Sequence, residues 1–300
     1  MAELSRLEVL KLIAIGKKVN FAGFDLSELA LKGICLKKAN LSRALLSYCN
    51  LTYADLRGCD FRGATIQETD FQEALLQEAN FYGACLEGSS LTNLNLSGVD
   101  FSYTLSDGAD FSGSDLQFTD FTQASLENSN FIKANMALAD FSCAILNNAC
   151  FNEAELTRVK LGAANMMNID FSQAKLRSAY LDFSILDGAN FTGANLEGAN
   201  LEDVSLIGAN LSGANLKGAN LRGSNLTGAN LTEANLEGVD LGGEDGFRNT
   251  DLSESVLIGA NFTRAHLSGT IVNKANFQDV LFSEAIIKDV NFSDTINYTS

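Results

Sequence analysis

Gly193-Ala194-Asn195-Leu196-Glu197-Gly198-Ala199-Asn200-Leu201 is the stretch in which the fold of this chain can be read most directly. Leu returns after five residues, and Ala and Asn precede it each time. A five-residue period matches neither the 3.6-residue period of a helix nor the two-residue period of a strand. The chain must therefore turn a corner once per repeat, and four right-angle corners close one square coil.

The same period extends over almost the whole chain. From Phe21 to Leu241 a large apolar residue occupies every fifth position, and only Ser106 breaks the series. The residue two positions earlier is small, the slot between them is usually Asn or Asp, and two exposed residues follow. We expect coils stacked about 4.8 Å apart, with the large and small residues filling the bore. Phe in alternate repeats predicts two stacked columns: Phe61, Phe81, Phe101, Phe121 and Phe141, and Phe111, Phe131, Phe151, Phe171 and Phe191.

The repeats resemble the A(D/N)LXX motif of the pentapeptide-repeat family, as in Ala194-Asn195-Leu196 and Ala199-Asn200-Leu201. The resemblance covers about residues 19–297. It implies an all-β fold, namely a right-handed quadrilateral β-helix, which is a form of β-solenoid.

The N-terminus is expected to cover the first coil with a short helix over residues 6–15. Ser5 and Glu8 have the spacing of a capping box, and Gly16 supplies a C-terminal stop. The apolar residues expected to lie on the first coil are Leu7, Leu10 and Ile13.

The predicted organisation is an N-terminal capping helix within residues 1–18, followed by one β-helix domain over residues 19–300. The repeat changes register once, because Leu241 and Phe247 are six residues apart instead of five. This spacing predicts a one-residue insertion that bulges a corner near residues 242–247, where glycines permit unusual backbone angles.

The composition is strongly acidic, with a formal net charge of −16 and a sequence pI of about 4.4. Phosphate backbones are bound by Lys and Arg, so this charge argues against direct nucleic-acid binding and favours a protein partner with a basic surface. Residues 61–160 are the acidic part, with four basic residues against fourteen acidic ones.

Within this part, four aspartates are separated by multiples of one coil and should share a wall: Asp60, Asp100, Asp120 and Asp140. Asp110 and Asp115 extend the acidity to other walls. Like charges about 5 Å apart repel one another, so retaining them costs stability. We therefore interpret this set as a candidate interaction surface. The alternative is that the charge only keeps the protein in solution.

Near the C-terminus, apolar residues replace Asn or Asp in the outward slot: Val256, Ile271, Leu281 and Ile286. No capping helix follows them. An apolar collar beside an uncovered end predicts self-association as a homodimer or a partner, unless a wider coil buries these residues.

No catalytic, cofactor-binding or metal-binding set is found in the sequence. His266 is the only histidine, and the six cysteines show no ligand spacing such as CxxC. No secretory signal and no membrane-spanning run is found, so we expect a cytoplasmic protein that does not interact with a membrane.

The resemblance extends to cyanobacterial pentapeptide-repeat proteins whose N-terminal helix leads into the first repeats. It implies a non-enzymatic interaction, scaffold or regulatory module. An alternative is the branch of DNA mimics that bind a type II topoisomerase such as gyrase. An enzyme is the third class, disfavoured because a bore filled with Leu and Phe leaves no pocket.

Overall fold

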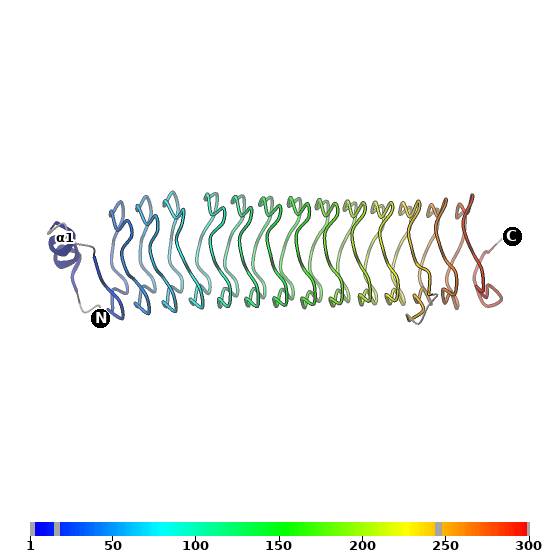
Figure 1. Ribbon diagram of the computed structural model, residues 1–300, viewed down its shortest axis with the longest axis horizontal. Helices are drawn as coiled ribbons and strands as arrows, with labels where there is room; N and C mark the ends of the chain where they lie inside the picture. Colours follow the sequence, from blue (N-terminus) through cyan, green and yellow to red (C-terminus); the bar gives the residue numbers. More distant parts are fainter. Residues whose placement is uncertain (1–3, 15–18, 244–247, 299–300) are drawn as a thin grey trace. The chain divides into compact units, whose positions relative to one another are not determined.

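The computed structural model describes residues 4–14, 19–243 and 248–298. Among these residues, the only helix is α1 (Arg6–Ala14), and the repeats follow it as a series of coils (Figure 1). The chain divides into two compact units, Met1–Cys150 and Phe151–Ser300, which are described separately here as unit 1 and unit 2. Within the described residues each wall of a coil pairs through a single residue, so no longer strand is formed.

Parallel bridges set the register of the coils in both units. Asn40 pairs with Asp60 in unit 1, and Asn195 pairs with Asn215 in unit 2. Partners are therefore four repeats apart, as the five-residue period predicts. This register confirms a β-helix with four walls per coil.

The Asn or Asp slot has a backbone function in this register. In repeat 56–60, three N–H groups donate to neighbouring coils, and that of Cys59 donates across the corner to the Leu56 carbonyl, at 3.0 Å. The remaining N–H, that of Arg57, donates to the Asp55 carboxylate, at 3.3 Å. Buried backbone N–H groups need acceptors, and the side-chain oxygen of this slot accepts the one N–H of the following corner that no carbonyl accepts.

The bore is filled as the repeat predicts, and from Leu31 to Phe277 the large and small inward residues that the structure describes are buried, whereas Ile287 in the C-terminal part of unit 2 is 39% exposed. The Phe121 ring stacks on Phe101, at 4.9 Å between centroids, and on Phe141, at 4.7 Å. Edge contacts to Phe111 and Phe131 connect it with the opposite column. The first predicted column therefore forms in unit 1. In the second, Phe111 stacks on Phe131 in unit 1, and Phe171 stacks on Phe191 in unit 2.

The capping box at the start of α1 is confirmed. The Ser5 N–H donates to Glu8 Oε2, at 2.7 Å, and the Glu8 N–H donates to Ser5 Oγ, at 3.4 Å. The predicted buried face is wrong, because Leu7 and Leu10 are exposed and Val9 is fully buried. Ile13, one turn after Val9, is half-buried, so the covered face passes through these two residues. The predicted stop at Gly16 and the boundary after residue 18 involve residues 15–18, which lie outside the described ranges.

The insertion is larger than the sequence predicts. Across it, Asp240 pairs with His266, which lies 26 residues further on, six more than the 20 of an ordinary coil. The prediction of a one-residue insertion is therefore wrong, because the pairing shifts by one whole repeat and one further residue. The five-residue pattern reveals the length of an insertion only after whole repeats of five are subtracted. An insertion of six residues therefore leaves the same pattern as an insertion of one. Phe247, expected to open the new register, lies outside the described residues.

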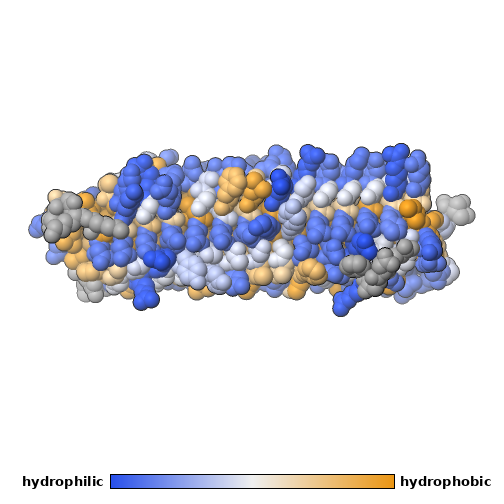
Figure 2. Space-filling model, viewed as in Figure 1, coloured by the Kyte–Doolittle hydropathy of each residue, from blue (hydrophilic) through white to orange (hydrophobic). Residues whose placement is uncertain are grey.

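The outer surface alternates between hydrophilic and apolar residues. In Figure 2 hydrophilic side chains form rows along the coils, and apolar side chains are exposed between the rows. These rows follow from the register, because residues one coil apart stack on one another.

Candidate interaction surface

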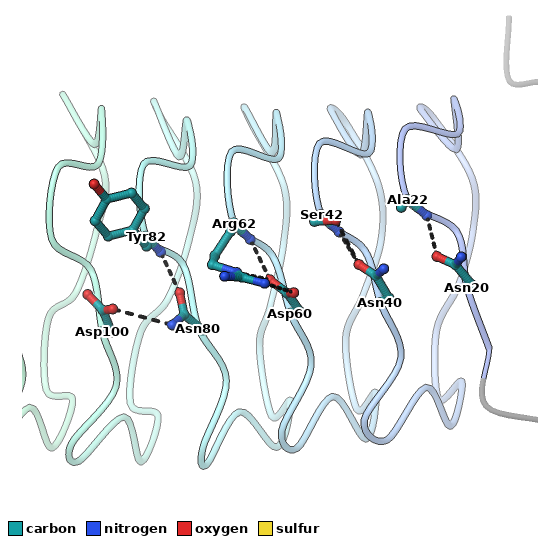
Figure 3. Close-up of polar contacts among 9 residues, drawn as sticks. All are labelled: Asn20, Ala22, Asn40, Ser42, Asp60, Arg62, Asn80, Tyr82 and Asp100. Atoms are coloured by element: carbon teal, nitrogen blue, oxygen red, sulfur yellow. Dashed lines mark hydrogen bonds and ion pairs between the residues drawn. The ribbon is translucent and has the colours of Figure 1, made fainter.

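The aspartates predicted to share a wall lie in one column of unit 1. Bridges join Asp60 to Asn80, Asn80 to Asp100, Asp100 to Asp120, and Asp120 to Asp140. Figure 3 shows the N-terminal part of this column, with its side chains aligned on one wall. We call this wall face A, and we call its three consecutive aspartates, Asp100, Asp120 and Asp140, the acidic column.

Each aspartate of the acidic column also closes a corner of its own coil. Its Oδ1 accepts the backbone N–H two residues later, at 2.9 Å from Ser102, 2.8 Å from Thr122 and 3.0 Å from Ser142. The three side chains are exposed or half-buried. The carboxylates are therefore held in place by the turn while they remain accessible from outside.

Asp60 differs from the acidic column in its surroundings. Its Oδ2 lies 2.7 Å from Nη2 of Arg62, which folds back onto it in Figure 3. Asn80 separates it from Asp100 and donates its Nδ2 to Asp100 Oδ2, at 3.3 Å. The uninterrupted negative charge therefore begins at Asp100.

The structure places Asp110 and Asp115 on two other walls. Asp110 lies between Ser90 and Asn130, and Asp115 lies between Asn95 and Asn135. Neither has an aspartate on the adjacent coil. They add negative charge to unit 1, but they do not join the acidic column.

Sequence reasoning missed four large side chains at the two corners that border face A. Tyr82 and Tyr103 lie on the following corner, 46% and 48% exposed, with ring centroids 5.3 Å apart. Phe118 and Leu138 lie on the preceding corner, 60% and 42% exposed. The signal was available, since these residues occupy the two positions after an inward residue, where the pattern mostly has Gly or polar residues.

A second acidic set, Glu87, Asp107 and Glu127, was also missed, although it has the same 20-residue spacing. Its carboxylates accept hydrogen bonds from within unit 1. Gln67 donates to Glu87 at 2.7 Å, Asn147 donates to Glu127 at 2.9 Å, and the Glu127 N–H donates to Asp107 at 2.9 Å. These bonds give this set a structural role.

The predicted C-terminal collar is distributed over four walls of unit 2. Val256, Ile271, Leu281 and Ile286 each pair with a different wall of the coil before. Val256 and Ile271 are half-buried, whereas Leu281 and Ile286 are 57% and 56% exposed. Of the four collar residues, only Leu281 and Ile286 therefore present substantial apolar surface.

His266 lies in a cluster that the register change creates. Its Nδ1 lies 3.1 Å from Asp240 Oδ1, and its Nε2 lies 3.0 Å from Ser268 Oγ. The connectivity is that of a Ser-His-Asp triad, but Ser268 is 1% exposed, so its hydroxyl is not positioned to attack a substrate. The ring lies against Gly242, where an added Cβ would be 2.5 Å from Cε1. The cluster therefore closes the corner beside the insertion.

All six cysteines are free thiols. Cys49 and Cys59 face the bore and donate to carbonyl oxygens one coil away. Burial raises the pKa of Cys49 to about 11 and that of Cys59 to about 12, which keeps both protonated at neutral pH. Across the described ranges, no three or more His, Cys, Asp or Glu side chains are grouped in a way that would hold a metal ion.

α1 has nine residues, and in the described part of the chain no helix has the length and apolarity needed to cross a membrane.

Known proteins provide a comparison for this geometry. The sequence matches the family described as pentapeptide repeats, in overlapping stretches that together span residues 25–243 and 247–296. No curated protein matches the sequence.

Solved structures with similarity to this chain include several pentapeptide repeat proteins. HetL, involved in heterocyst differentiation regulation in the cyanobacterium Nostoc sp. strain PCC 7120, is 25% identical over 99% of both chains, with a TM-score of 0.33. A protein of the Arabidopsis thaliana thylakoid lumen is 44% identical over 32% of this chain and 63% of its own, with a TM-score of 0.29. QnrB1, a plasmid-mediated fluoroquinolone resistance protein, is 21% identical over 64% of this chain and 89% of its own, with a TM-score of 0.38.

Proposed function

Because the chain belongs to the pentapeptide-repeat family, we propose that it is a non-enzymatic interaction or scaffold module whose acidic column meets a basic surface of a protein partner. The observation that carries this proposal is the register of Asp100, Asp120 and Asp140 on three consecutive coils. Their slot also accepts Asn, which closes the same corner without charge. Three carboxylates about 4.8 Å apart repel one another, so their presence fits selection for a partner.

The charge around the acidic column supports a basic partner. Between residues 63 and 150, Lys133 is the only basic residue, against twelve Asp and Glu residues. A negative surface of this kind raises the association rate of a positive one and selects against acidic competitors.

Affinity capture with a matched pair of variants tests the proposal. The first variant replaces Asp100, Asp120 and Asp140 with Asn, which removes three charges and keeps the corner bonds. The control removes three charges elsewhere through Glu28→Gln, Glu73→Gln and Glu233→Gln, all at exposed positions. A partner retained by wild type and control but lost from the first variant is the expected result. Recovery of the same proteins by all three would overturn the assignment of the acidic column.

The second candidate is a DNA mimic that binds a type II topoisomerase, and the regular spacing of the acidic column is the observation that favours it. In this case the protein inhibits DNA supercoiling by purified gyrase, and the inhibition weakens as salt is raised. Supercoiling that is unaffected at micromolar protein removes this candidate.

The proposal also includes a homodimer formed through the C-terminal end. Leu281 and Ile286 are exposed there, and Tyr298 stacks on Phe292 with 4.1 Å between centroids. Replacing Leu281 and Ile286 with Ser should shift the sedimentation equilibrium toward monomer. A wild-type protein that sediments as a monomer at high concentration would end this part of the proposal.

We place the protein in the cytoplasm, because six free thiols suit a reducing compartment.

A further inference from the structure

The exposed apolar side chains beside face A form two edges around the acidic column. Phe118 and Leu138 lie on consecutive coils at one corner, and Tyr82 and Tyr103 do so at the other. We call these four residues the aromatic rim. In Figure 3 the Tyr82 ring extends toward the coil of Asp100, which agrees with its contact to Tyr103.

The aromatic rim and the acidic column together describe the chemistry of a ligand. Exposed aromatic side chains are enriched at protein interfaces, where they act as anchors. Because the centre of this surface is negative, the complementary group is a cation with a flat face or an apolar stem. Arginine has both properties, since its guanidinium binds carboxylates side-on and stacks on aromatic rings.

The spacing of the acidic column selects the shape of the partner. Its carboxylates recur about every 4.8 Å, so the outer two lie about 9.6 Å apart. A helix rises about 1.5 Å per residue, which separates residues i and i+3 by about 4.5 Å and residues i and i+7 by about 10.5 Å. Residues with this spacing also lie on one side of a helix.

We infer that the aromatic rim and the acidic column bind an amphipathic helix of the partner that carries arginine at i, i+3 and i+7. This inference rests on the proposed function and names the partner's chemistry. The three arginines pair with Asp100, Asp120 and Asp140. Apolar residues beside the arginines pack against Phe118 and Leu138 on one corner.

The probe is a fluorescently labelled, alanine-based helical peptide with arginine at i, i+3 and i+7 and leucine beside the arginines. A second peptide has the same composition, with its arginines distributed around the helix. A third has lysine in place of arginine. Binding is measured by fluorescence anisotropy at low salt, where charge pairs are least screened.

We expect the in-register arginine peptide to bind wild type about tenfold more tightly than the distributed peptide, which corresponds to one factor of ten in Kd. The lysine peptide should fall between the two. Replacing Asp100, Asp120 and Asp140 with Asn should reduce the in-register peptide to the level of the distributed one.

Two variants test the aromatic rim without harming the fold. Phe118 and Leu138 have φ angles of 59° and 64°, and glycine occupies the same corner one coil earlier at Gly98. Phe118→Gly with Leu138→Gly should therefore keep the thermal midpoint and weaken the in-register peptide about fivefold, as loss of anchors does. Phe183→Gly is the matched control, with an exposed ring at φ 60° on a corner of unit 2 and outside the aromatic rim, and should leave binding unchanged.

Equal binding of the two arginine peptides would overturn the inference, as would unchanged binding after Phe118→Gly with Leu138→Gly. These failures differ from failure of the proposed function. If the affinity capture loses a partner from the Asp→Asn variant but the protein binds both arginine peptides equally, the proposed function stands and only this inference fails. A partner captured equally by wild type and that variant rejects the proposed function itself.

Discussion

Two columns built from the same repeat differ in the side-chain interactions that they make between successive coils. Face A of unit 1 has Asp100, Asp120 and Asp140 outside and phenylalanines inside, whereas a column of unit 2 has Asn195, Asn215 and Asn235 outside, with leucines inside. In both columns the side-chain Oδ1 accepts the N–H two residues later. The corner is therefore closed equally well by either residue type.

The difference lies in the second polar atom of the side chain. Asn215 Nδ2 donates to Asn195 Oδ1 at 3.2 Å, and Asn235 Nδ2 donates to Asn215 Oδ1 at 3.1 Å, so the amides join successive coils. An ionised aspartate has no donor, and neighbouring carboxylates repel by roughly 1 kcal/mol in water. The comparison shows that the fold requires an acceptor in this slot, while the choice between amide and carboxylate remains for stability or recognition.

The largest expected effect comes from the inner side of the two columns. Phe121→Ala should lower the free energy of unfolding by about 3–5 kcal/mol, because it leaves a cavity between two stacked rings. Leu216→Ala in unit 2 should cost less, toward the lower end of about 2–5 kcal/mol. Denaturant unfolding measures the loss in free energy of unfolding for both variants. An equal loss, or a larger loss for Leu216→Ala, would contradict a special role for ring stacking.

Replacing the acidic column with Asn should stabilise unit 1. The change allows two new amide bonds between coils, worth about 0.5–1.5 kcal/mol each, and removes repulsion. Thermal unfolding should show a higher midpoint for the variant, with a gap from wild type that narrows at high salt. A variant less stable than wild type would show that the bonds these carboxylates accept, such as the one from Asn80 Nδ2 to Asp100 Oδ2, outweigh the repulsion.

The reverse change in unit 2 should have a smaller effect of opposite sign. Asn215→Asp removes the donor to Asn195 and should destabilise by about 1 kcal/mol at neutral pH. The control is Asn273→Asp, at an exposed position of unit 2. Equal unfolding curves for the two variants would show that the amide column contributes nothing measurable.

The smallest effect concerns the end of unit 1, which has a helix, whereas no helix is described in unit 2. Hydrogen bonds from Ser5 lower the pKa of Glu8, so this carboxylate stabilises α1 above its unfolded pKa. The contribution is lost as pH falls through the lowered pKa. The protection of the α1 amides against hydrogen exchange, taken relative to their intrinsic exchange rates at each pH, should therefore decrease in acid, and Glu8→Gln should flatten this dependence. An identical profile for both proteins would contradict the capping box as its cause.

Most of the architecture could be predicted from the spacing of the inward residues. Phe101, Phe121 and Phe141 identify one wall of the bore, and the acidic column follows from the outward slot before each of them. A strict period places residues on walls because the backbone bonds of every coil depend on the coil beside it.

The sequence by itself determined the five-residue period, the filled bore and the alignment of Asp100, Asp120 and Asp140. Only the tertiary structure decided that the pairing shifts by six residues after Gly243, which stacks His266 on Asp240. It also decided that Val9 is the buried residue of α1. The physical reason is that a repeat fixes position only up to whole repeats, whereas an insertion and a covered end depend on contacts that do not repeat.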